Sequence, residues 1–550
     1  MIIWLQGPSG AGKTTVGREL ARLRRWRFID IDEAIELRDG RTISAIFAGD
    51  GEGHFRALER EMILSVSAEP ADAVIAPGAG ALHDPRVRRA IMASGIRVFI
   101  DPEPEEALRR LAGDASRPML AHGDRAASWK SLRADRLPLY RDADIIISGH
   151  GDAATVATEI DRRVELLERP EWSFSSVLSG EVSTVSWFHA PHILFRHLRS
   201  LAGGCRLCVI GDWNVLERFA AFAPDGSGDL ILPIDPGEAS KSLATVEGLA
   251  ARMAEHGCTR DAIIVGIGGG VVTDLAGFLG SIYMRGVRTI CIPTTLLAQV
   301  DASIGGKTAV NAAGVRNLIG TFKQPSDVLM CGAFLRSLPP RELRSGFVES
   351  LKMGIANSAD LARAVEDAMP AILDGALPEN LVDLVRLSVG TKLDVVERDT
   401  HDTSLRLSLN FGHTFGHALE AVAPGVYAHG EAVAFGLVAA ALMALELGVA
   451  GDDRCRWIID RSLRLTHDPG MEQDAAAIIT AMDSDKKRVG ADIRFVLPAG
   501  TTGVVIREIG DRELVMGIVR RALELVREHH RRGFRPFSNG GITGISIGTS

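Results

Sequence analysis

A glycine-rich stretch with one lysine and two threonines, GPSGAGKTT, follows the apolar run MIIWLQ. It satisfies the pattern G-x-x-x-x-G-K-[ST], in which backbone N–H groups turn toward phosphates, the lysine reaches the terminal phosphates and the hydroxyl suits Mg²⁺. A strand before the loop and a helix after it, VGRELARLRR, supply the context that the pattern requires. The loop does not by itself distinguish kinases from other nucleoside triphosphatases. The predicted ATP site consists of Gly7, Gly10, Gly12, Lys13, Thr14 and Thr15.

Two aspartates and three arginines downstream have the chemistry of a pocket for a second substrate. In FIDIDEAIE, Asp30 and Asp32 are expected on the same side of a strand end, where one carboxylate can organise Mg²⁺ and the other can accept a substrate hydroxyl. Arg56, Arg117 and Arg136 follow in FRALE, SRPML and RLPLYR. One such arginine alone is typical of a solvated surface charge. The ordered set predicts a pocket for a small carboxylate, with a mobile arginine over the phosphates.

Histidines in the second half of the chain have the spacing of metal ligands. NFGHTFGHALE places His413 and His417 four residues apart on an expected helix, so that one side chain lies above the other. AHGEA adds His429, and GFVESLK adds Glu349. A set of this kind suits a three-ligand Zn²⁺ site with an open position. The spacing predicts a metal without deciding which histidines bind it.

A glycine cluster, GIGGGVVTDLAGF, resembles a dinucleotide fingerprint only in part. Gly266 and Gly268 match its first two glycines, but Val271 stands at the third glycine position. The cluster alone is therefore weak evidence for a bound dinucleotide. The following segment, RGVRTICIPTTLLAQVDASIGGKTAVN, is stronger evidence for a site because it combines glycine-rich turns, paired threonines and Lys307.

The elements that must position these residues fall into separate parts of the chain. Short apolar runs alternate with amphipathic stretches over 1–168, which predicts a parallel α/β sheet. A second α/β series occupies 173–325. Helical periodicity dominates 326–533, so we expect an all-α lobe there. The small, polar tail at 534–550 is expected to be disordered.

The bulk composition excludes several classes of protein. A net charge of −8 over 550 residues argues against a general nucleic-acid binder. Apolar stretches are broken by Gly, Pro or charge before 18 residues, so no membrane span is expected. Six cysteines are too sparse for a disulfide scaffold. Since the opening residues lack a basic leader, we expect a cytoplasmic enzyme.

Over 1–165 the sequence resembles shikimate kinase. The matching motifs are the phosphate loop, FxDxD, GExxFRxxE, a glycine turn, RP-(L/M)-L and R-x-P-L-Y. The resemblance implies Mg²⁺ held by Thr14 and Asp30, Arg117 as a lid arginine, and catalytic roles for Lys13, Asp32 and Arg117. It implies shikimate contacts from Asp32, Arg56, Gly78, Ala79, Gly80 and Arg136. The family has three consecutive glycines at the turn, and a positive φ at Ala79 would cost about 1 kcal/mol, so we expect a reduced fit there and no loss of activity.

Over 173–530 the sequence resembles 3-dehydroquinate synthase through the long motif PTTLLAQVDASIGGKTAVN. The resemblance implies NAD⁺ and a divalent metal, Zn²⁺ or Co²⁺, with Glu349, His413 and His429 as metal ligands. The implied NAD⁺ contacts are Asp212, Glu238, Lys241, Gly269, Gly270, Asp274, Thr294, Thr295, Asp301, Lys307 and Arg316. The implied contacts to 3-deoxy-D-arabino-heptulosonate 7-phosphate are Arg285, Lys307, Asn317, Lys352, Lys392, Arg406, Asn410, His417 and Lys486. All of the latter set except Arg285, Asn317 and Lys486 are also expected to be catalytic.

The implied chemistry explains why so many cations are needed. The substrate carries a carboxylate and a phosphate, and its conversion involves transient oxidation by NAD⁺, β-elimination of phosphate, reduction, ring opening and an aldol closure. The resemblance also implies a homodimer through this half, with Arg285 lent across the interface. One departure is Arg316, which stands where the family has lysine. Because a guanidinium is bulkier than an ammonium, we expect a change in cofactor affinity or phosphate placement.

The favoured prediction is a bifunctional enzyme of the shikimate pathway, which makes aromatic amino acid precursors. Its partners would be the small molecules shikimate, ATP and heptulosonate phosphate. Two alternatives stay open. The second half is another sugar-phosphate cyclase or a polyol dehydrogenase of the same lobe plan, or the kinase-like half is a weak or inactive ATP-binding module, for which Ala79 is the only support.

Overall fold

The computed structural model describes residues 1–69, 71–112, 125–178, 180–218, 228–399, 405–470, 473–483, 488–489, 492–500 and 503–532. The chain forms two compact units. The first is built mainly from Met1–Pro170, and the second from Glu171–Ala190, Leu198–Glu217 and the described residues from 228 onward. Predictions for Arg117, Lys486 and the tail 534–550 fall outside the described residues.

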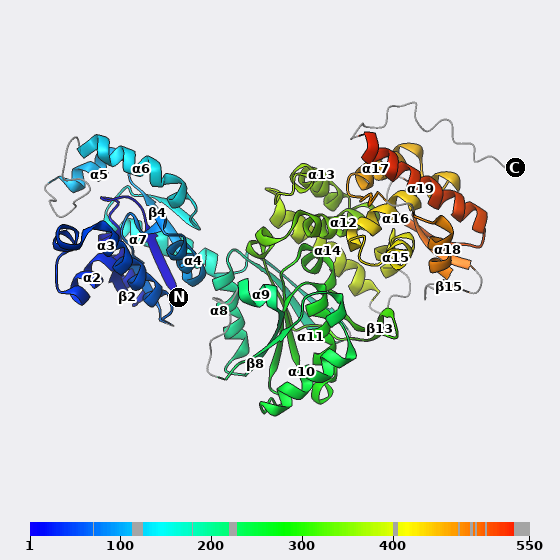
Figure 1. The fold of residues 1–550 in the computed structure, drawn as a ribbon, viewed down its shortest axis with the longest axis horizontal. Coiled ribbons are helices and arrows are strands. Elements are labelled where there is room, and N and C mark those ends of the chain that lie inside the picture. The colour runs from blue at the N-terminus through cyan, green and yellow to red at the C-terminus, as the bar shows by residue number, and fades with distance from the viewer. Residues whose placement is uncertain are drawn as a thin grey trace. The chain divides into compact units, whose positions relative to one another are not determined.

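The first unit is a parallel five-stranded sheet with helices between its strands, drawn in blue and cyan in Figure 1. The strand order is β2-β3-β1-β4-β5, and each neighbouring pair is parallel. The strands are β1 (Ile2–Gln6), β2 (Arg27–Asp30), β3 (Ala73–Ala76), β4 (Gly95–Asp101) and β5 (Ile145–Ser148). The helices are α1 (Lys13–Arg24), α2 (Ile31–Asp39), α3 (Ile43–Ser67), α4 (Pro85–Ser94), α5 (Pro104–Leu111), α6 (Arg125–Arg141) and α7 (Ala153–Glu168).

The middle strands of this sheet are apolar along their whole length. All five residues of β1, IIWLQ, and all four of β3, AVIA, are buried. Parallel strands that are covered on both faces require such continuous apolar runs. Because β1 lies in the middle of the sheet, the loop that follows it opens at the carboxyl edge, where α/β sheets bind their ligands.

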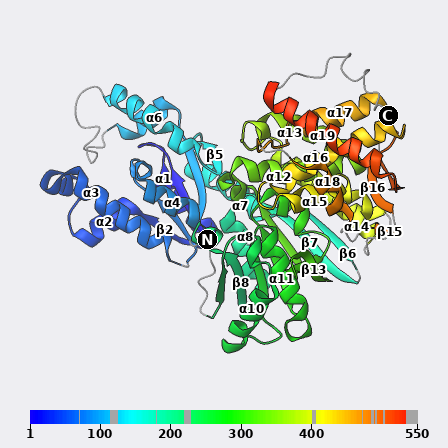
Figure 2. The ribbon, with the colours of Figure 1, turned by 45° about the vertical axis from the view of Figure 1, so that its right-hand side comes forward.

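The second unit begins with a seven-stranded sheet of order β6-β7-β14-β11-β10-β8-β9. The pair β6–β7 is antiparallel and the other neighbouring pairs are parallel. The strands are β6 (Trp172–Leu178), β7 (Glu181–Phe188), β8 (Leu207–Asp212), β9 (Leu230–Ile234), β10 (Ile263–Gly268), β11 (Arg288–Pro293) and β14 (Asp327–Cys331). The helices in this part are α9 (Trp213–Arg218), α10 (Leu243–Glu255) and α11 (Gly270–Ile282), while α8 (Pro191–Ala202) is divided between the two units. Figure 2 shows α10 and α11 beside these strands.

An antiparallel hairpin joins this sheet to the rest of the unit. It consists of β12 (Lys307–Ala312) and β13 (Val315–Phe322), which form a separate two-stranded sheet. Most of β13 is exposed, whereas β12 packs against α11. The hairpin therefore presents its turn and one strand away from the core.

The remainder of the second unit is mostly helical and has one large apolar core. Its helices are α12 (Pro340–Asn357), α13 (Ala359–Leu373), α14 (Leu381–Arg398), α15 (His413–Val422), α16 (His429–Glu446), α17 (Asp452–Leu463), α18 (Ala475–Asp483) and α19 (Arg512–Arg532). A small antiparallel sheet is added by β15 (Arg488–Val489), β16 (Asp492–Pro498) and β17 (Val504–Ile509). The expected all-α lobe is thus corrected. The strands β16 and β17 are short apolar runs that pair with each other and pack on the core. Helical periodicity in the surrounding sequence does not reveal such a pairing.

Helix α16 is long and apolar enough to cross a membrane by length and composition alone. The segment is interrupted by Gly430, Glu431 and Gly436, as expected from the sequence, although its mean hydropathy reaches that of a membrane span. In the structure 83% of its apolar window is buried among other helices. Its apolar residues are explained by that burial, because a helix that is apolar all round belongs in the core of a protein or in a membrane.

Candidate active sites

The phosphate loop after β1 adopts the backbone conformation that its glycines permit. Gly10 and Gly12 have φ values of 82° and 88°, and a Cβ at Gly10 would lie 2.6 Å from the carbonyl oxygen of Ala107. Gly12 is the N-cap of α1, which starts at Lys13. The Lys13 Nζ donates to the carbonyl oxygen of Gly7 at 2.8 Å. A loop of this kind at a helix N-terminus is suited to bind phosphate.

A hydroxyl and a carboxylate meet beside this loop. Thr14 Oγ1, in the first turn of α1 before Thr15, donates to Asp30 Oδ2 at 2.7 Å. Asp30 ends β2 and is also the N-cap of α2, and its Oδ1 accepts from the backbone N–H of Asp32 at 3.0 Å. Asp32 therefore lies in the first turn of a helix, not on the strand as expected, because the cap starts the helix directly after the strand. The two oxygens have the chemistry that Mg²⁺ prefers.

The glycine turn after β3 packs against a charged pair on α3. Arg56 Nη1 donates to Glu59 Oε2 at 2.7 Å. A Cβ at Gly80 would lie 2.6 Å from Arg56 Nη2, and a Cβ at Gly78 would overlap Glu59 and lie 3.3 Å from Asp32 Oδ1. Glycine at both positions thus lets the turn touch the pair. The structure brings Asp32, Arg56 and the turn into one pocket.

Helix α6 closes the other side of this pocket. The Tyr140 hydroxyl donates to the carbonyl oxygen of Ala79 at 2.6 Å, and Arg136, one turn earlier, is 9% exposed. Arg136 Nε and Glu59 Oε1 are buried without a hydrogen-bond partner, which fits a pocket that takes a polar ligand. Ala79 does not have a positive φ. The backbone strain expected at Ala79 is therefore absent. The close approaches to Glu59 and Arg56 are made by Gly78 and Gly80 on either side of it.

Three residues from three helices form the predicted metal group. Glu349 of α12, His413 of α15 and His429 of α16 each offer a ligand atom within 4.8 Å of the others. Glu349 Oε1 lies 3.7 Å from His413 Nε2 and 3.4 Å from His429 Nε2. A tetrahedral ion with bonds of about 2.1 Å places its ligands roughly 3.4 Å apart. The group therefore fits Zn²⁺ or an ion of similar size.

The charge of this group favours a cation. Glu349 is completely buried and neither carboxylate oxygen has a well-formed hydrogen bond, although Lys352 forms an ion pair with it. Burial raises the pKa of Glu349, but Lys352 and His429 outweigh burial and lower it to about 2. Burial likewise lowers the pKa of His429, whereas its contacts with the carboxylates of Glu349 and Glu420 raise it to about 10. The two carboxylates beside the imidazole of His429 thus favour positive charge at this position.

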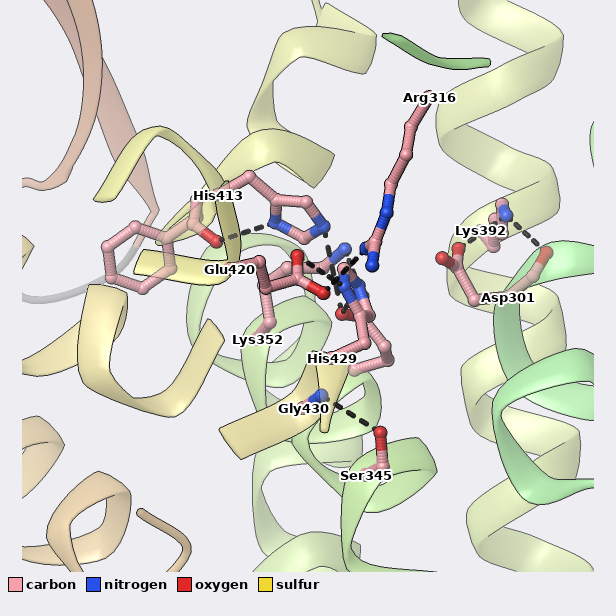
Figure 3. A network of polar contacts seen from close by, with 11 residues as sticks. Asp301, Arg316, Ser345, Lys352, Lys392, His413, Glu420, His429 and Gly430 are labelled. Atoms are coloured by element: carbon pink, nitrogen blue, oxygen red, sulfur yellow. Dashed lines mark hydrogen bonds and ion pairs between the residues drawn. The ribbon is translucent and has the colours of Figure 1, made fainter. Parts of the chain in front are cut away.

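Close helix packing brings the ligands together, as Figure 3 shows for the start of α16. The backbone N–H of Gly430 donates to Ser345 Oγ on α12 at 2.8 Å. A Cβ at Gly430 would overlap the backbone of Ser345, so glycine is required for this contact. Ser345 and Glu349 are four residues apart on α12 and share a face. The contact therefore places His429 opposite Glu349.

Predicted substrate cations surround the metal group. Lys392 of α14 forms an ion pair with Asp301 of the π-helical turn Ala298–Ala302 (Figure 3). Burial raises the pKa of Asp301, but Lys392 and Lys352 outweigh burial and lower it. Arg406 is buried, and its Nη2 donates to the carbonyl oxygen of Gly305 at 2.9 Å. The cations are held in place by carboxylates and carbonyl groups of the protein.

Several other predicted residues lie at recognisable places around this centre. His417, one turn after His413, has its ring 5.0 Å from that of His413 and 5.9 Å from that of His429. Asn410 ends the short helix that precedes α15. Lys307 begins β12, and Arg285 lies exposed in the turn after α11.

Most of the predicted dinucleotide residues gather at the carboxyl ends of neighbouring strands. Lys241 Nζ lies 2.5 Å from Asp274 Oδ2 and 2.6 Å from Asn317 Oδ1. Burial raises the pKa of Asp274 to about 6 although Lys241 acts against it. Glu238 Oε1 accepts from Asn311 Nδ2 at 2.8 Å. The end of β8, the junction of β10 with α11 and the end of β11 carry Asp212, Gly269, Gly270, Thr294 and Thr295.

Sequence reasoning missed two buried glutamates. Glu59 stands three residues after Arg56 in the quoted GExxFRxxE pattern, and burial raises its pKa although Arg56 acts against it. Glu420 stands three residues after His417 in GHALE. Its carboxylate accepts a hydrogen bond from Arg316 and lies 3.3 Å from Nδ1 of His429. The signal was helical spacing, which puts each glutamate on the face of a residue already selected. The structure also pairs Arg316 with Glu420, and not with the cluster around Lys241.

The two units define a P-loop phosphotransferase and a two-lobed enzyme with a metal-type centre between an α/β lobe and a helical lobe. The family model of shikimate kinase matches residues 9–165. The models of the 3-dehydroquinate synthase N-terminal and C-terminal parts match 231–345 and 346–488. Both resemblances read from the sequence are thereby confirmed.

A relative that spans nearly the whole chain combines the same two halves, and others match the second half. The bifunctional shikimate kinase/3-dehydroquinate synthase of Thermotoga maritima is 30% identical over 524 residues, which cover 94% of this chain and 98% of that protein. The 3-dehydroquinate synthase of Koribacter versatilis is 41% identical over 335 residues, 60% of this chain and 89% of that protein. The structure of 2-epi-5-epi-valiolone synthase from Streptomyces hygroscopicus, with NAD⁺ and Zn²⁺ bound, is 26% identical at a TM-score of 0.55 and covers 63% of this chain and 96% of that one. The chain belongs to the family of bifunctional shikimate kinase/3-dehydroquinate synthases.

Proposed function

We propose that the first unit transfers phosphate from ATP to shikimate and that the second converts 3-deoxy-D-arabino-heptulosonate 7-phosphate to 3-dehydroquinate and phosphate. The observation that carries the proposal is the buried group of Glu349, His413 and His429 with Lys352 and Lys392 beside it. A three-ligand group surrounded by cations suits a substrate that has both a hydroxyl to be activated and anionic groups to be held. We assign 1–168 to the kinase, 173–325 together with β14 to the α/β lobe, and the rest of 326–533 to the helical lobe.

In the kinase unit, ATP supplies the phosphoryl group, and Mg²⁺ bound near Thr14 and Asp30 would neutralise charge on the phosphates. Lys13 lies at the N-terminus of α1 and would stabilise charge on the transferred group. Asp32 would accept the proton of the shikimate hydroxyl, and Arg56 and Arg136 would hold the carboxylate. The orphaned polar atoms of that pocket support this assignment.

In the synthase unit, Glu349, His413 and His429 would hold Zn²⁺, which polarises a hydroxyl oxygen so that its proton leaves readily. NAD⁺, bound near Lys241 and Asp274, would act as a temporary hydride acceptor. The cations of the cleft would orient the anionic groups of the substrate. The ligand-set geometry supports Zn²⁺, and the Streptomyces relative contains both groups.

The remaining roles follow the same division. His417 would relay a proton at the rim of the metal group, and a homodimer through the synthase half would place Arg285 against a second copy. We also infer a cytoplasmic enzyme, with no nucleic acid or membrane as a partner.

A paired assay on the full chain tests both activities. The protein with heptulosonate phosphate, NAD⁺ and Zn²⁺ is expected to release inorganic phosphate, and with ATP and Mg²⁺ it is expected to form ADP faster when shikimate is added. No phosphate release would contradict the synthase assignment and favour another cyclase or a polyol dehydrogenase. ADP formation that ignores shikimate would favour an ATP-binding module in the kinase half.

A further inference from the structure

The two histidines of the metal group use their rings in the same way. In His413 the Nε2 atom faces Glu349, while Nδ1 lies 3.3 Å from the carbonyl oxygen of Phe411. In His429 the Nε2 atom also faces Glu349, while Nδ1 lies 3.3 Å from Glu420 Oε2. A ligating histidine needs an acceptor for its other ring N–H, because that bond fixes the tautomer and the ring orientation. For His413 this acceptor is the backbone carbonyl of Phe411, and for His429 it is the side chain of Glu420.

Glu420 reaches His429 because of its place on α15. It stands seven residues after His413, which is two helical turns, so the two side chains lie on the same face of the helix. The side chain of Glu420 is 8% exposed. A carboxylate buried to this extent requires partners. One of its oxygens faces His429, and the other faces a cation.

That cation is Arg316 of the β12–β13 hairpin, whose Nη1 lies 2.9 Å from Glu420 Oε1 (Figure 3). The next residue, Asn317, contacts Lys241 on the opposite side of the hairpin. The backbone leaves the extended conformation at Asn317, whose φ is 51°, and the adjacent side chains of Arg316 and Asn317 make the two contacts. The hairpin therefore bridges the predicted dinucleotide cluster and the metal group through adjacent residues.

Charge balance alone does not explain the Glu420 contacts. The side chain of Arg316 is 55% exposed and can be solvated by water, whereas Glu420 is buried and cannot. If Glu420 served only to neutralise Arg316, it would not need to turn its second oxygen toward His429. The buried oxygen is therefore directed at the ring nitrogen on the far side from Glu349.

We propose that Glu420 is a positioning residue for the metal ligand His429, and that Arg316 holds Glu420 in place from the hairpin. Glu420 accepts a hydrogen bond from the Nδ1–H of His429, which keeps the proton on Nδ1 and leaves the Nε2 lone pair aimed at the metal position. Arg316 ties this arrangement to the segment that also carries Asn317. The proposal rests on the proposed metal site of Glu349, His413 and His429.

The test measures Zn²⁺ affinity of the full chain by competition with a chromophoric chelator. Glu420→Ala is expected to weaken Zn²⁺ binding about 10- to 100-fold, as losses of such outer partners do. Glu420→Gln keeps the shape and an acceptor oxygen but not the charge, so a smaller loss is expected. Arg316→Ala is expected to weaken binding by about fivefold or less, because the pair is partly exposed.

The matched control is Glu366→Ala in the same lobe. Glu366 of α13 pairs with Arg461 of α17 at 2.8 Å, and neither helix carries a proposed ligand, so its loss should leave Zn²⁺ affinity unchanged. The visible absorption of Co²⁺-loaded protein reports ligand geometry and should shift in Glu420→Ala but not in the control. If Glu420→Ala does not fold, Glu420→Gln carries the test through the same two measurements.

The results separate the two levels of the proposal. Unchanged Zn²⁺ affinity and Co²⁺ spectrum in folded Glu420 variants would overturn the positioning role. The role would also be overturned if the protein bound a second ion and Glu420→Ala removed that ion without weakening Zn²⁺ binding at the first site. In that case Glu420 would be a ligand of the second ion, together with His417 and His429. If His413→Ala binds Zn²⁺ as tightly as the unmodified chain, the metal site itself is wrong.

Discussion

Both active sites contain a buried glutamate beside a basic residue three positions away on the same helix, yet the pKa values of the two glutamates shift in opposite directions. In the kinase pocket, burial raises the pKa of Glu59 although Arg56 acts against it. In the metal centre, burial also opposes ionisation of Glu349, but Lys352 and His429 reverse it and lower the pKa to about 2. Each carboxylate has two cationic side chains near it, Arg56 and Arg136 at Glu59 and Lys352 and His429 at Glu349, but the balance between those cations and burial differs. Asp32 further raises the pKa of Glu59.

The two sites differ in how their charged groups are brought together. In the kinase pocket, Glu59 and Arg56 come from one helix and hold each other beside the glycine turn. The metal centre assembles an ionised carboxylate and two histidines from three helices, and so depends on tertiary packing for its charge as well as its shape. Substitutions should therefore affect one site and spare the other.

Removal of one metal ligand should have the largest effect. His413→Ala is expected to lower the synthase kcat by at least about 10³-fold, because a bound metal supplies several kcal/mol of stabilisation in the transition state. Phosphate release measures this loss. ADP formation with shikimate should be unchanged in the same protein, and a fall in both rates would mean that the two halves are coupled.

Loss of the loop lysine is the reciprocal experiment. Lys13→Ala is expected to lower the kinase kcat by about 10²- to 10³-fold, because it removes a charge aimed at the transferred phosphoryl group. A coupled assay for ADP measures the effect, and phosphate release from heptulosonate phosphate serves as the control. Full kinase activity in this variant would show that the loop does not hold the transferring phosphate.

The kinase glutamate gives a smaller change. Glu59→Gln is expected to raise the KM for shikimate about tenfold, since a hydrogen bond between charged groups that orients Arg56 is weakened. Initial rates at varied shikimate concentration measure it. An unchanged KM would mean that Arg56 is positioned without this carboxylate.

The same variant tests the sign of the pKa shift. Because the pKa of Glu59 is higher in the folded state, its contribution to stability is complete below the unfolded pKa and is lost as pH rises through the folded pKa. Relative to Glu59→Gln, the original protein should thus lose stability as pH rises from about 4. The kinase unit's unfolding transition is recognised because shikimate and ATP stabilise it, and its midpoint is measured against pH in both proteins. If the pKa of Glu59 were not raised, the two proteins would show the same pH dependence.

The smallest effect is expected at the glycine turn. Ala79→Gly should leave the KM for shikimate unchanged, because Ala79 does not have a positive φ and its carbonyl already reaches Tyr140. Stability of the kinase unit should fall by about 0.4–1 kcal/mol, through greater freedom of the unfolded chain. A clear gain in shikimate affinity would instead support the reduced fit that the sequence suggested for this position.

The sequence by itself determined the features that depend on local pattern. The phosphate loop needs glycines at fixed intervals and a following helix, and His413 and His417 need only helical spacing. The long PTTLLAQVD motif and the apolar runs of the parallel strands likewise identify families and sheets from contiguous residues. Family membership, both enzyme activities and the α/β class followed from these patterns.

Only the tertiary structure decided which distant residues meet. It placed Asp32 on a helix, added the small sheet β15–β17 and joined Arg316 to Glu420 and His429. These outcomes depend on packing between elements far apart in the chain, such as the contact of Gly430 with α12. Periodicity within one segment carries no information about the partner that buries it, which is why spacing predicted a metal but left its ligands open.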